Sequence, residues 1–291
     1  MKLIWRDCNL KIDKVNFRAV QFFFIKMKNF FGEGWEDIKQ GTLSLSLPLY
    51  LARSDIRQRY RRSSLGPFWI TISTGVMIAC IGVIFGSLFK APMSDFLPFL
   101  AAGLIIWSFV SNTILEATTV FVTSEPIIKQ LPIPLISHVY RMIFRNLYIF
   151  LHNIIIFPLV LLFVHRPVNL EILWVIPGLF LLFANLLWIS ILLGVVCTRF
   201  RDLTQIVASV LQIFFYLTPI IWMPNLLPER TSVMVLDPNP FYHLLALIRE
   251  PLMAQSPTLF NWVFSILLCL GGSLFAIAFF NKYRNRIAYW L

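Results

Sequence analysis

A cluster of arginines directly before a long apolar run is the densest group of chemically active side chains in this sequence. Guanidinium groups are permanently charged and attract the anionic headgroups of membrane lipids. No charged side chain follows from Pro67 to Phe89. The pattern therefore predicts a basic strip at a membrane surface, beside the point where the chain enters the bilayer. The arginines are Arg53, Arg57, Arg59, Arg61 and Arg62.

A surface helix and a sharp turn are predicted around these arginines. Apolar residues recur three and four positions apart while the arginines cover other faces, which indicates an amphipathic helix in the membrane interface. Glycine then permits unusual dihedral angles, and proline suits a first helical turn. A simpler interpretation, an anchor that only sets topology, stays open. The stripe residues are Leu45, Leu49, Ala52, Ile56 and Tyr60, and the turn residues are Leu65, Gly66 and Pro67.

The composition excludes a water-soluble globule. Of the 291 residues, 58% are hydrophobic and only 13% are charged, against roughly 25% in a typical soluble domain. The formal net charge of +11 could indicate a nucleic-acid partner. The basic residues lie next to apolar runs, however, where lipid headgroups and insertion rules account for them. We therefore expect no nucleic-acid partner.

Charge-free intervals predict an all-α integral membrane protein with six spans. Each interval reaches the roughly 20 residues that a helix needs to cross about 30 Å of hydrocarbon. The last two intervals are longer, so their helices are expected near 203–223 and 259–280. The intervals are Pro67–Phe89, Phe96–Leu115, Asn146–His165, Ile172–Thr198, Leu203–Pro228 and Pro251–Asn281.

The distribution of lysine and arginine predicts that both termini are cytoplasmic. The two terminal segments and the two loops assigned to the same side hold all but four of the 25 basic residues, and such residues are retained on the cytoplasmic side. The expected organisation is a tail at 1–40, an interface helix at 41–66 and a transmembrane domain at 67–291.

A docking element is predicted in the second cytoplasmic loop. Prolines divide this loop into short pieces, and one piece combines a small apolar face with one acidic and one basic residue. A short helix with exposed apolar residues is typical of a surface that binds a partner. An ordinary turn at the lipid interface is the alternative. The residues are Glu125, Pro126, Ile127, Ile128, Lys129, Gln130 and Leu131.

The long segment before the last span predicts a short apolar helix on the outside. Asn239 is a suitable N-cap and Pro240 suits the first helical position, while Pro251 limits the helix. It is too short to span the membrane and too apolar for water. We expect it to dip into the outer leaflet or to plug a pathway.

Aromatic side chains of the first and fifth spans are candidates for lining a pathway. Sugars stack on aromatic faces through their C–H surfaces, so a ring-lined path would let a glycan slide. Helix packing and lipid contact are the alternative roles. The candidates are Phe68, Trp69, Phe85, Phe89, Phe214, Phe215, Tyr216 and Trp222.

Several chemistries find no support in the sequence. The central parts of the spans lack ionisable residues, which disfavours ion-coupled transport. No G-x-x-x-x-G-K-[ST] motif is present, so any ATP must be hydrolysed by a separate chain. The cysteines and histidines are scattered, so we expect no metal and no cofactor on this chain.

Five segments resemble one family. They are similar, in order along the chain, to segments of ABC-2-type permeases that export polysaccharides, including O-antigen, capsular polysaccharide and teichoic acid. The resemblance covers about Leu47 to Leu291 and leaves the first 40 residues unmatched. The segments are DIRQRYRRSSLGPFW (Asp55–Trp69), EPIIKQLPIP (Glu125–Pro134), RFRDL (Arg199–Leu203), TPIIW (Thr218–Trp222) and NPFYHLLALIREPL (Asn239–Leu252).

The resemblance implies a homodimer in the bacterial inner membrane, paired with two copies of a cytoplasmic ATP-binding subunit that holds ATP and Mg. It implies that Glu125–Leu131 is the coupling helix for that subunit. The substrate would be a polysaccharide on undecaprenyl pyrophosphate, attracted to the arginine strip with Tyr60. The outer gate would comprise Asn239, Pro240, Phe241, Tyr242, His243 and Arg249.

Two other functions stay open. One is an exporter of a lipid, drug or other small molecule in the same family. The other is a membrane scaffold or enzyme outside it, for which Asp237 and His243 in the outside segment would be the candidate residues.

Overall fold

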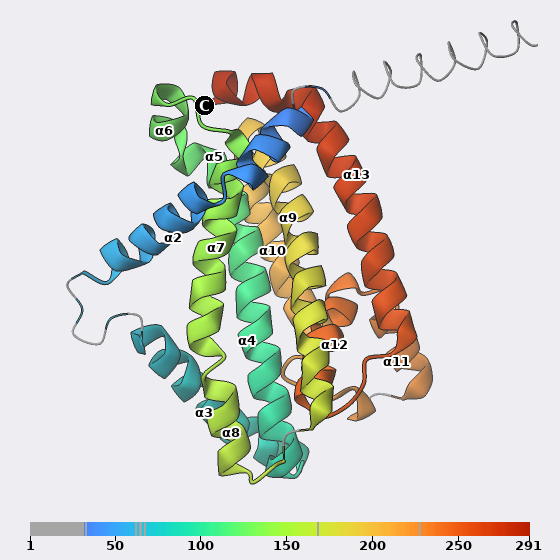
Figure 1. Cartoon of the computed structure of the whole chain (residues 1–291). Coiled ribbons are helices and arrows are strands. Elements are labelled where there is room, and N and C mark those ends of the chain that lie inside the picture. The colour runs from blue at the N-terminus through green and yellow to red at the C-terminus, as the bar shows by residue number, and fades with distance from the viewer. Residues whose placement is uncertain are drawn as a thin grey trace, which may run out of the picture.

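The computed structural model describes residues 32, 34–61, 63, 66, 68–167, 169–226 and 228–291, and every element within these ranges is helical. The predicted all-α class is therefore confirmed. The helices form an elongated bundle (Figure 1). Residues 34–43 form a helix at its edge. The other elements are α2 (Ser46–Arg59), α3 (Phe68–Phe89), α4 (Met93–Ala117), α5 (Val120–Thr123), α6 (Glu125–Gln130), α7 (Leu135–Asn153), α8 (Ile156–Phe163), η1 (Leu170–Trp174), α9 (Val175–Arg199), α10 (Leu203–Leu217), η2 (Pro224–Leu226), α11 (Glu229–Leu236), α12 (Pro240–Leu252) and α13 (Leu259–Trp290).

Helix α4 is the centre of the bundle. Its most apolar window is 78% buried, against 11% for α3 and 17% for α13. It contacts α3, α7, α9, α10 and α12. On α3, Gly82 allows the close approach, because a Cβ there would lie 2.6 Å from the side chain of Leu97 on α4. Helices α3 and α13 therefore form outer edges whose apolar faces remain free for lipid or for another subunit.

Five described helical segments are long and apolar enough to cross a membrane: Phe68–Phe89, Met93–Ala117, Leu135–Phe163, Leu170–Arg199 and Leu259–Trp290. The predicted fifth span is shorter than expected. Helix α10 has 15 residues, which gives roughly 22 Å at 1.5 Å per residue. It ends at Leu217 because Thr218 precedes Pro219, and the residue before a proline is driven out of the helical region.

The third span begins earlier than predicted. Helix α7 starts at Leu135, whereas the sequence interval began at Asn146 because Arg141 and Arg145 were expected to lie in a loop. Both arginines instead lie within the helix. They are tolerated there because neighbouring carboxylates neutralise them.

The chain directly after α10 is irregular and is held by Arg249 of α12 and by Asn239, the N-cap of that helix. Arg249 of α12 donates a hydrogen bond to the Pro219 carbonyl, and Asn239 donates to the Thr218 hydroxyl at 2.9 Å. Non-helical backbone inside a membrane bundle needs such partners, because lipid supplies none. Asn239 also accepts from the backbone N–H groups of Phe241 and Tyr242, so the predicted N-cap of this helix is confirmed.

The two ends of the bundle carry different elements. Helices α2, α5 and α6 and the C-terminal end of α13 lie together at one end, called here the α6 end, whereas α8, α11 and α12 lie toward the other, the α12 end (Figure 1). The guanidinium of Arg199 lies 5.8 Å from the ring of Trp290, so the turn between α9 and α10 also belongs to the α6 end.

Two adjacent glycines of α13 test the packing of this helix on α9. A Cβ on Gly272 would collide with the indole of Trp188, whereas a Cβ on Gly271 would meet nothing within 4 Å. Both Gly→Ala changes gain similar helix propensity, so the difference isolates the clash. We expect Gly272→Ala to lower the unfolding free energy by about 1–3 kcal/mol relative to Gly271→Ala. Thermal unfolding of the purified variants in detergent measures this, and equal stabilities would contradict the packing.

Candidate functional site

Helix α6 projects from the bundle as a short exposed element (Figure 1). It forms where the sequence predicted a docking helix, and none of its residues is buried. Lys129 and Glu125 pair at 2.7 Å across one turn. Ile128 packs in the same apolar cluster as Trp290 and Leu291 at the end of α13. Because α6 also contacts α13, a partner that pushed α6 would displace it against that helix.

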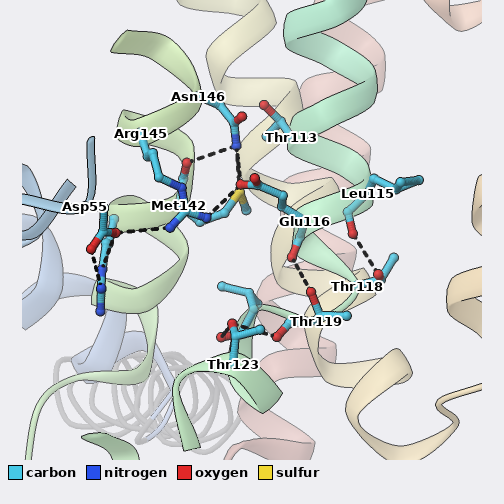
Figure 2. A network of polar contacts seen from close by, with 12 residues as sticks. Asp55, Thr113, Leu115, Glu116, Thr118, Thr119, Thr123, Met142, Arg145 and Asn146 are labelled. Atoms are coloured by element: carbon cyan, nitrogen blue, oxygen red, sulfur yellow. Dashed lines mark hydrogen bonds and ion pairs between the residues drawn. The ribbon is translucent and has the colours of Figure 1, made fainter. Parts of the chain in front are cut away.

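A charged network ties α2 to the bundle beside α6 (Figure 2). Arg141 of α7 donates to both carboxylate oxygens of Asp55 on α2, at 2.8 and 2.6 Å. Arg145, one turn further along α7, donates to Asp55 at 3.0 Å and to Glu116 of α4 at 2.8 Å. Asn146 donates to the same Glu116 oxygen at 2.7 Å. Helices α2, α7 and α4 are thus joined by one continuous set of hydrogen bonds.

The network lowers the pKa of the Asp55 carboxyl below its ordinary value of 3.8. Partial burial is the largest single influence and raises the pKa, but the hydrogen bond and charge of Arg141, together with the charge of Arg145, outweigh it. Asp55 is therefore ionised at neutral pH. A depressed pKa means that its contribution to stability is complete above the ordinary pKa and disappears as the pH falls through the lowered one.

A polar cavity of about 250 Å³ borders the network. It lies between α4, α5 and α7, next to Ser124 at the start of α6. The ion-paired side chains therefore adjoin space on one side, rather than close packing. Its lining includes Glu116, Thr119, Thr123, His138, Arg141 and Arg145.

The described arginines of the strip take no part in this network. Arg53, Arg57, Arg59 and Arg61 are exposed and Tyr60 is half-buried, while Arg62 lies outside the described residues. Ala52 of the same helix is fully buried. The sequence analysis missed the role of Asp55, although it is the single acidic residue of α2. Its partners Arg141 and Arg145 are one helical turn apart, which was a readable signal of a shared face.

The predicted turn into α3 is described only at Gly66. Its φ of +59° lies in the left-handed region that glycine adopts without strain, as the sequence predicted. Its N–H is bonded to the Ser63 hydroxyl at 3.1 Å. Leu65 and Pro67 lie outside the described residues.

The aromatic candidates do not share one surface. Phe68, Trp69 and Tyr216 are 55–62% exposed. The other candidates are partly buried and packed within the bundle. Measured between ring centroids, Phe214 lies 4.9 Å from Phe241, Phe215 lies 6.0 Å from Trp107, and Phe85 lies 5.6 Å from Phe89. The indole N–H of Trp222 donates a hydrogen bond to the Tyr216 carbonyl at 3.1 Å. Only part of the predicted set therefore reaches the surface of this chain.

A polar stripe on α10 was missed by the sequence analysis. Its members are spaced four, three and four residues apart, so they share one helix face, and all four side chains are exposed. Two of them, Gln212 and Tyr216, line a cavity of about 300 Å³ between α10 and α4, which Trp107, Ser111 and Asn112 also line. The spacing was readable in the sequence. The stripe, named here the α10 stripe, comprises Gln205, Ser209, Gln212 and Tyr216.

Some of the predicted outer-gate residues are packed inside the fold, whereas others line a cavity. Pro240 and Phe241 are partly covered, while Asn239 and His243 are buried. The ring nitrogens of His243 each lie 2.8 Å from a partner, the side chain of Asn261 and the carbonyl of Asp237. His243 is thereby held as part of the fold.

A cavity of about 660 Å³ lies beside α12 and is lined by Tyr242, Arg249, Glu250, Asp95 and Arg166, among others. Arg249 is 3% exposed, and its guanidinium lies 4.2 Å from the ring centre of Phe99. Among the described residues no group of His, Cys, Asp and Glu has the arrangement of a metal site.

An apolar helical bundle with a projecting short helix at one end and a polar stripe on its side has the features of a transporter membrane subunit. Residues 49–253 match the family described as ABC-2 type transporter. The chain therefore belongs to the ABC-2 type transporter family and is a multi-pass membrane protein. The membrane scaffold or enzyme outside this family is set aside by that match.

Two curated relatives share most of their length with this chain. Both are described as O-antigen export system permease protein RfbA, from Klebsiella pneumoniae. One is 25% identical over 250 residues and the other 24% identical over 249. Each alignment covers 83% of this chain and 93% of the relative.

Replacing Asp55 tests the network. We expect Asp55→Asn to lower the unfolding free energy by about 1–3 kcal/mol at pH 7, because two arginines lose a charged acceptor. The deficit relative to the native chain should be constant between pH 7 and 5, shrink as the pH falls past the ordinary pKa of 3.8, and vanish only below the lowered pKa of the folded state. Thermal unfolding across this pH range measures it, with Asp202→Asn at an exposed position as control. A deficit that did not change with pH would contradict the assignment.

Proposed function

We propose that this chain is the membrane-spanning subunit of an ATP-driven exporter that moves lipid-linked polysaccharide, most closely of the O-antigen type, across the bacterial inner membrane. Membership of the ABC-2 family supports the transporter class. The two relatives named for O-antigen export support the substrate class. The observation that carries the proposal is the α10 stripe with its neighbours on α4.

The polar side chains of the α10 stripe would be energetically unfavourable on a helix face that contacts lipid. An amide without a hydrogen-bond partner costs roughly 2–7 kcal/mol in an apolar medium. Gln212 and Asn112 are nevertheless exposed on the flank of an apolar bundle. A glycan offers hydroxyl donors and acceptors along its whole length and would satisfy these groups as it passes. A lipid or small apolar drug would favour a mainly apolar pocket, so the stripe favours the glycan.

A second copy of the chain would complete the path. The α10 stripe lies on an open face, so one chain alone leaves it unenclosed. Two copies facing each other would place two stripes around a common polar path, whereas the apolar faces of α3 and α13 would remain available for lipid. We therefore propose a homodimer with the path between its subunits. A strictly monomeric exporter in nanodiscs would contradict this arrangement.

The ATP-binding subunit would dock on α6. The exposed residues Pro126, Lys129 and Gln130 offer it a mixed polar and apolar surface. Two copies of that subunit would hold ATP and Mg and drive the homodimer. Purification of the tagged chain in mild detergent tests this, and the absence of any copurifying Walker-motif ATPase would contradict it.

The positions of the two ends of the described chain are consistent with six membrane crossings. Arg284 of α13 contacts Asp37, which precedes the first span, at 2.9 Å. Two segments at the same end of a bundle require an even number of crossings between them. We propose that α10 with residues 218–223 supplies the sixth crossing, and that the basic α6 end faces the cytoplasm. An outside location of the C-terminus in a reporter-fusion assay would contradict this topology.

The exposed arginine strip is proposed to attract the pyrophosphate of the lipid-linked glycan. Guanidinium groups bind phosphate oxygens through paired hydrogen bonds, and Arg59 and Arg61 lie free of the Asp55 network. If alanine at both positions left export and substrate-stimulated ATP hydrolysis intact, the strip would serve only as an anchor.

Apolar replacement within the α10 stripe tests the function. We expect Gln212→Leu to reduce surface polysaccharide by about tenfold or more, because loss of about 1.4 kcal/mol at one step is tenfold in rate. Ile213→Leu, on the adjacent exposed face of α10, is the control and should export normally. Immunodetection of surface polysaccharide measures export, with membrane levels of each variant determined in parallel. Normal export by Gln212→Leu would contradict the proposed path.

A further inference from the structure

The helix of residues 34–43 is fitted closely to two other helices by one of its faces. Gly34, Asp37 and Gly41 are three and four residues apart and therefore share that face. A Cβ on Gly34 would lie 2.6 Å from the Asn281 backbone of α13, and a Cβ on Gly41 would collide with Ile136 of α7. Glycine is needed at both positions for this approach. One helix face thus touches α13 at one end and α7 at the other.

Between the two glycines, Asp37 joins both helices. Its carboxylate is buried and accepts hydrogen bonds from the backbone N–H groups of Leu135 and Ile136, at 3.1 and 3.0 Å. It also accepts from Arg284 Nε of α13 at 2.9 Å. The first N–H groups of a helix have no partner within it, and the residue before α7, Pro134, provides no side-chain cap. Asp37 therefore caps α7 from another helix while it pairs with α13.

This joint lies where displacement of α6 would enter the bundle. Helix α6 leads into α7 through residues 131–134, which are not helical and contain Pro132 and Pro134. Asp37 holds α7 at the far end of that linker. Helix α6 also contacts α13, and Ile128 packs against the same apolar cluster as the end of that helix. Asp37 is bonded to α7, into which α6 leads, and to α13, which α6 contacts.

The two charged residues of this joint, Asp37 and Arg284, lie outside the part of the chain that matches the ABC-2 family. The match covers residues 49–253, whereas Asp37 precedes it and Arg284 follows it. Family membership therefore assigns no role to either residue.

We propose that Asp37 is a positioning residue for coupling. It locks the start of α7 to the end of α13, so that displacement of α6 moves the two helices together instead of bending the linker. A buried carboxylate with three donors resists opening, because separation would leave an uncompensated charge in the protein. The inference rests on the proposed function only in taking α6 as the element that an ATP-driven partner displaces.

The first experimental arm measures the joint itself, by hydrogen exchange on the purified full-length permease. In Asp37→Ala the amides of Leu135 and Ile136 should exchange about tenfold faster, since a lost cap of about 1.4 kcal/mol corresponds to that factor. Glu36→Ala removes an exposed carboxylate of the same helix and should leave both amides unchanged. Equal exchange rates in the two variants would contradict the proposed capping of α7 by Asp37.

The second arm measures coupling in the assembled exporter with its ATP-binding subunit in cell-derived membranes. Asp37→Ala should lower the amount of polysaccharide exported per ATP hydrolysed by at least about fivefold, the lower end of typical coupling effects, while ATP turnover remains. A purely structural role would reduce folded protein and ATP turnover together and leave the ratio intact. An unchanged ratio with faster amide exchange would therefore overturn the proposal.

Two further variants keep the proposal testable if Asp37→Ala does not fold. Arg284→Gln removes the ion pair but keeps the cap, and should also lower the amount of polysaccharide exported per ATP hydrolysed. Gly41→Ala displaces the helix without touching the charge, with Gly271→Ala as its control. If the native assembly exported no polysaccharide, the proposed function would fail, whereas the exchange arm would still decide whether Asp37 forms the joint.

Discussion

The pairing of Asp55 with Arg141 and Arg145 is the interaction on which the α6 end depends. It allows α7 to continue as a helix through two arginines, and so to reach from the α6 linker into the apolar bundle. It fixes α2 against that helix, and through Arg145 it reaches Glu116 at the end of α4, the central helix. Without a carboxylate on α2, Arg145 would keep Glu116, whereas Arg141 would lose the carboxylate that it binds. Helix α2 is therefore a structural part of the bundle as well as the helix that carries the exposed arginines.

The same requirement, that polar groups inside a membrane bundle find partners, organises the α12 end. Helix α10 ends at a proline, and α12 supplies Arg249 and Asn239 to the irregular chain that follows. A polar group that faces outward without a hydrogen bond to the protein needs a different partner, such as water or a passing substrate. The exposed amide of Gln212 in the α10 stripe and that of Asn112 on α4 are such groups, which is why the stripe supports the proposed path more strongly than the aromatic residues do.

Local features of this structure could be predicted from the sequence, because neighbouring residues determine them. The long apolar helices, the short helix at α6, the Asn239 cap and the left-handed Gly66 are of this kind. The end of α10 was misplaced because hydropathy continues past Pro219 while the helix does not. The start of α7 was misplaced because its charges were taken as a boundary. Asp55 and Asp37 were missed because their partners lie some 80 to 250 positions away along the chain, and a single sequence carries no signal for such pairs. The exposure of each aromatic ring depends on tertiary packing in the same way.

If a polysaccharide passes along the α10 stripe, a photo-crosslinking amino acid at position 212 should capture it in cells that produce the polysaccharide. Position 213, on the neighbouring face of α10, is the comparison. We expect a light-dependent adduct at position 212 that reacts with antibody against the polysaccharide, is absent at position 213, and disappears when glycan synthesis is blocked. Adducts with lipid alone at both positions would rule out this path.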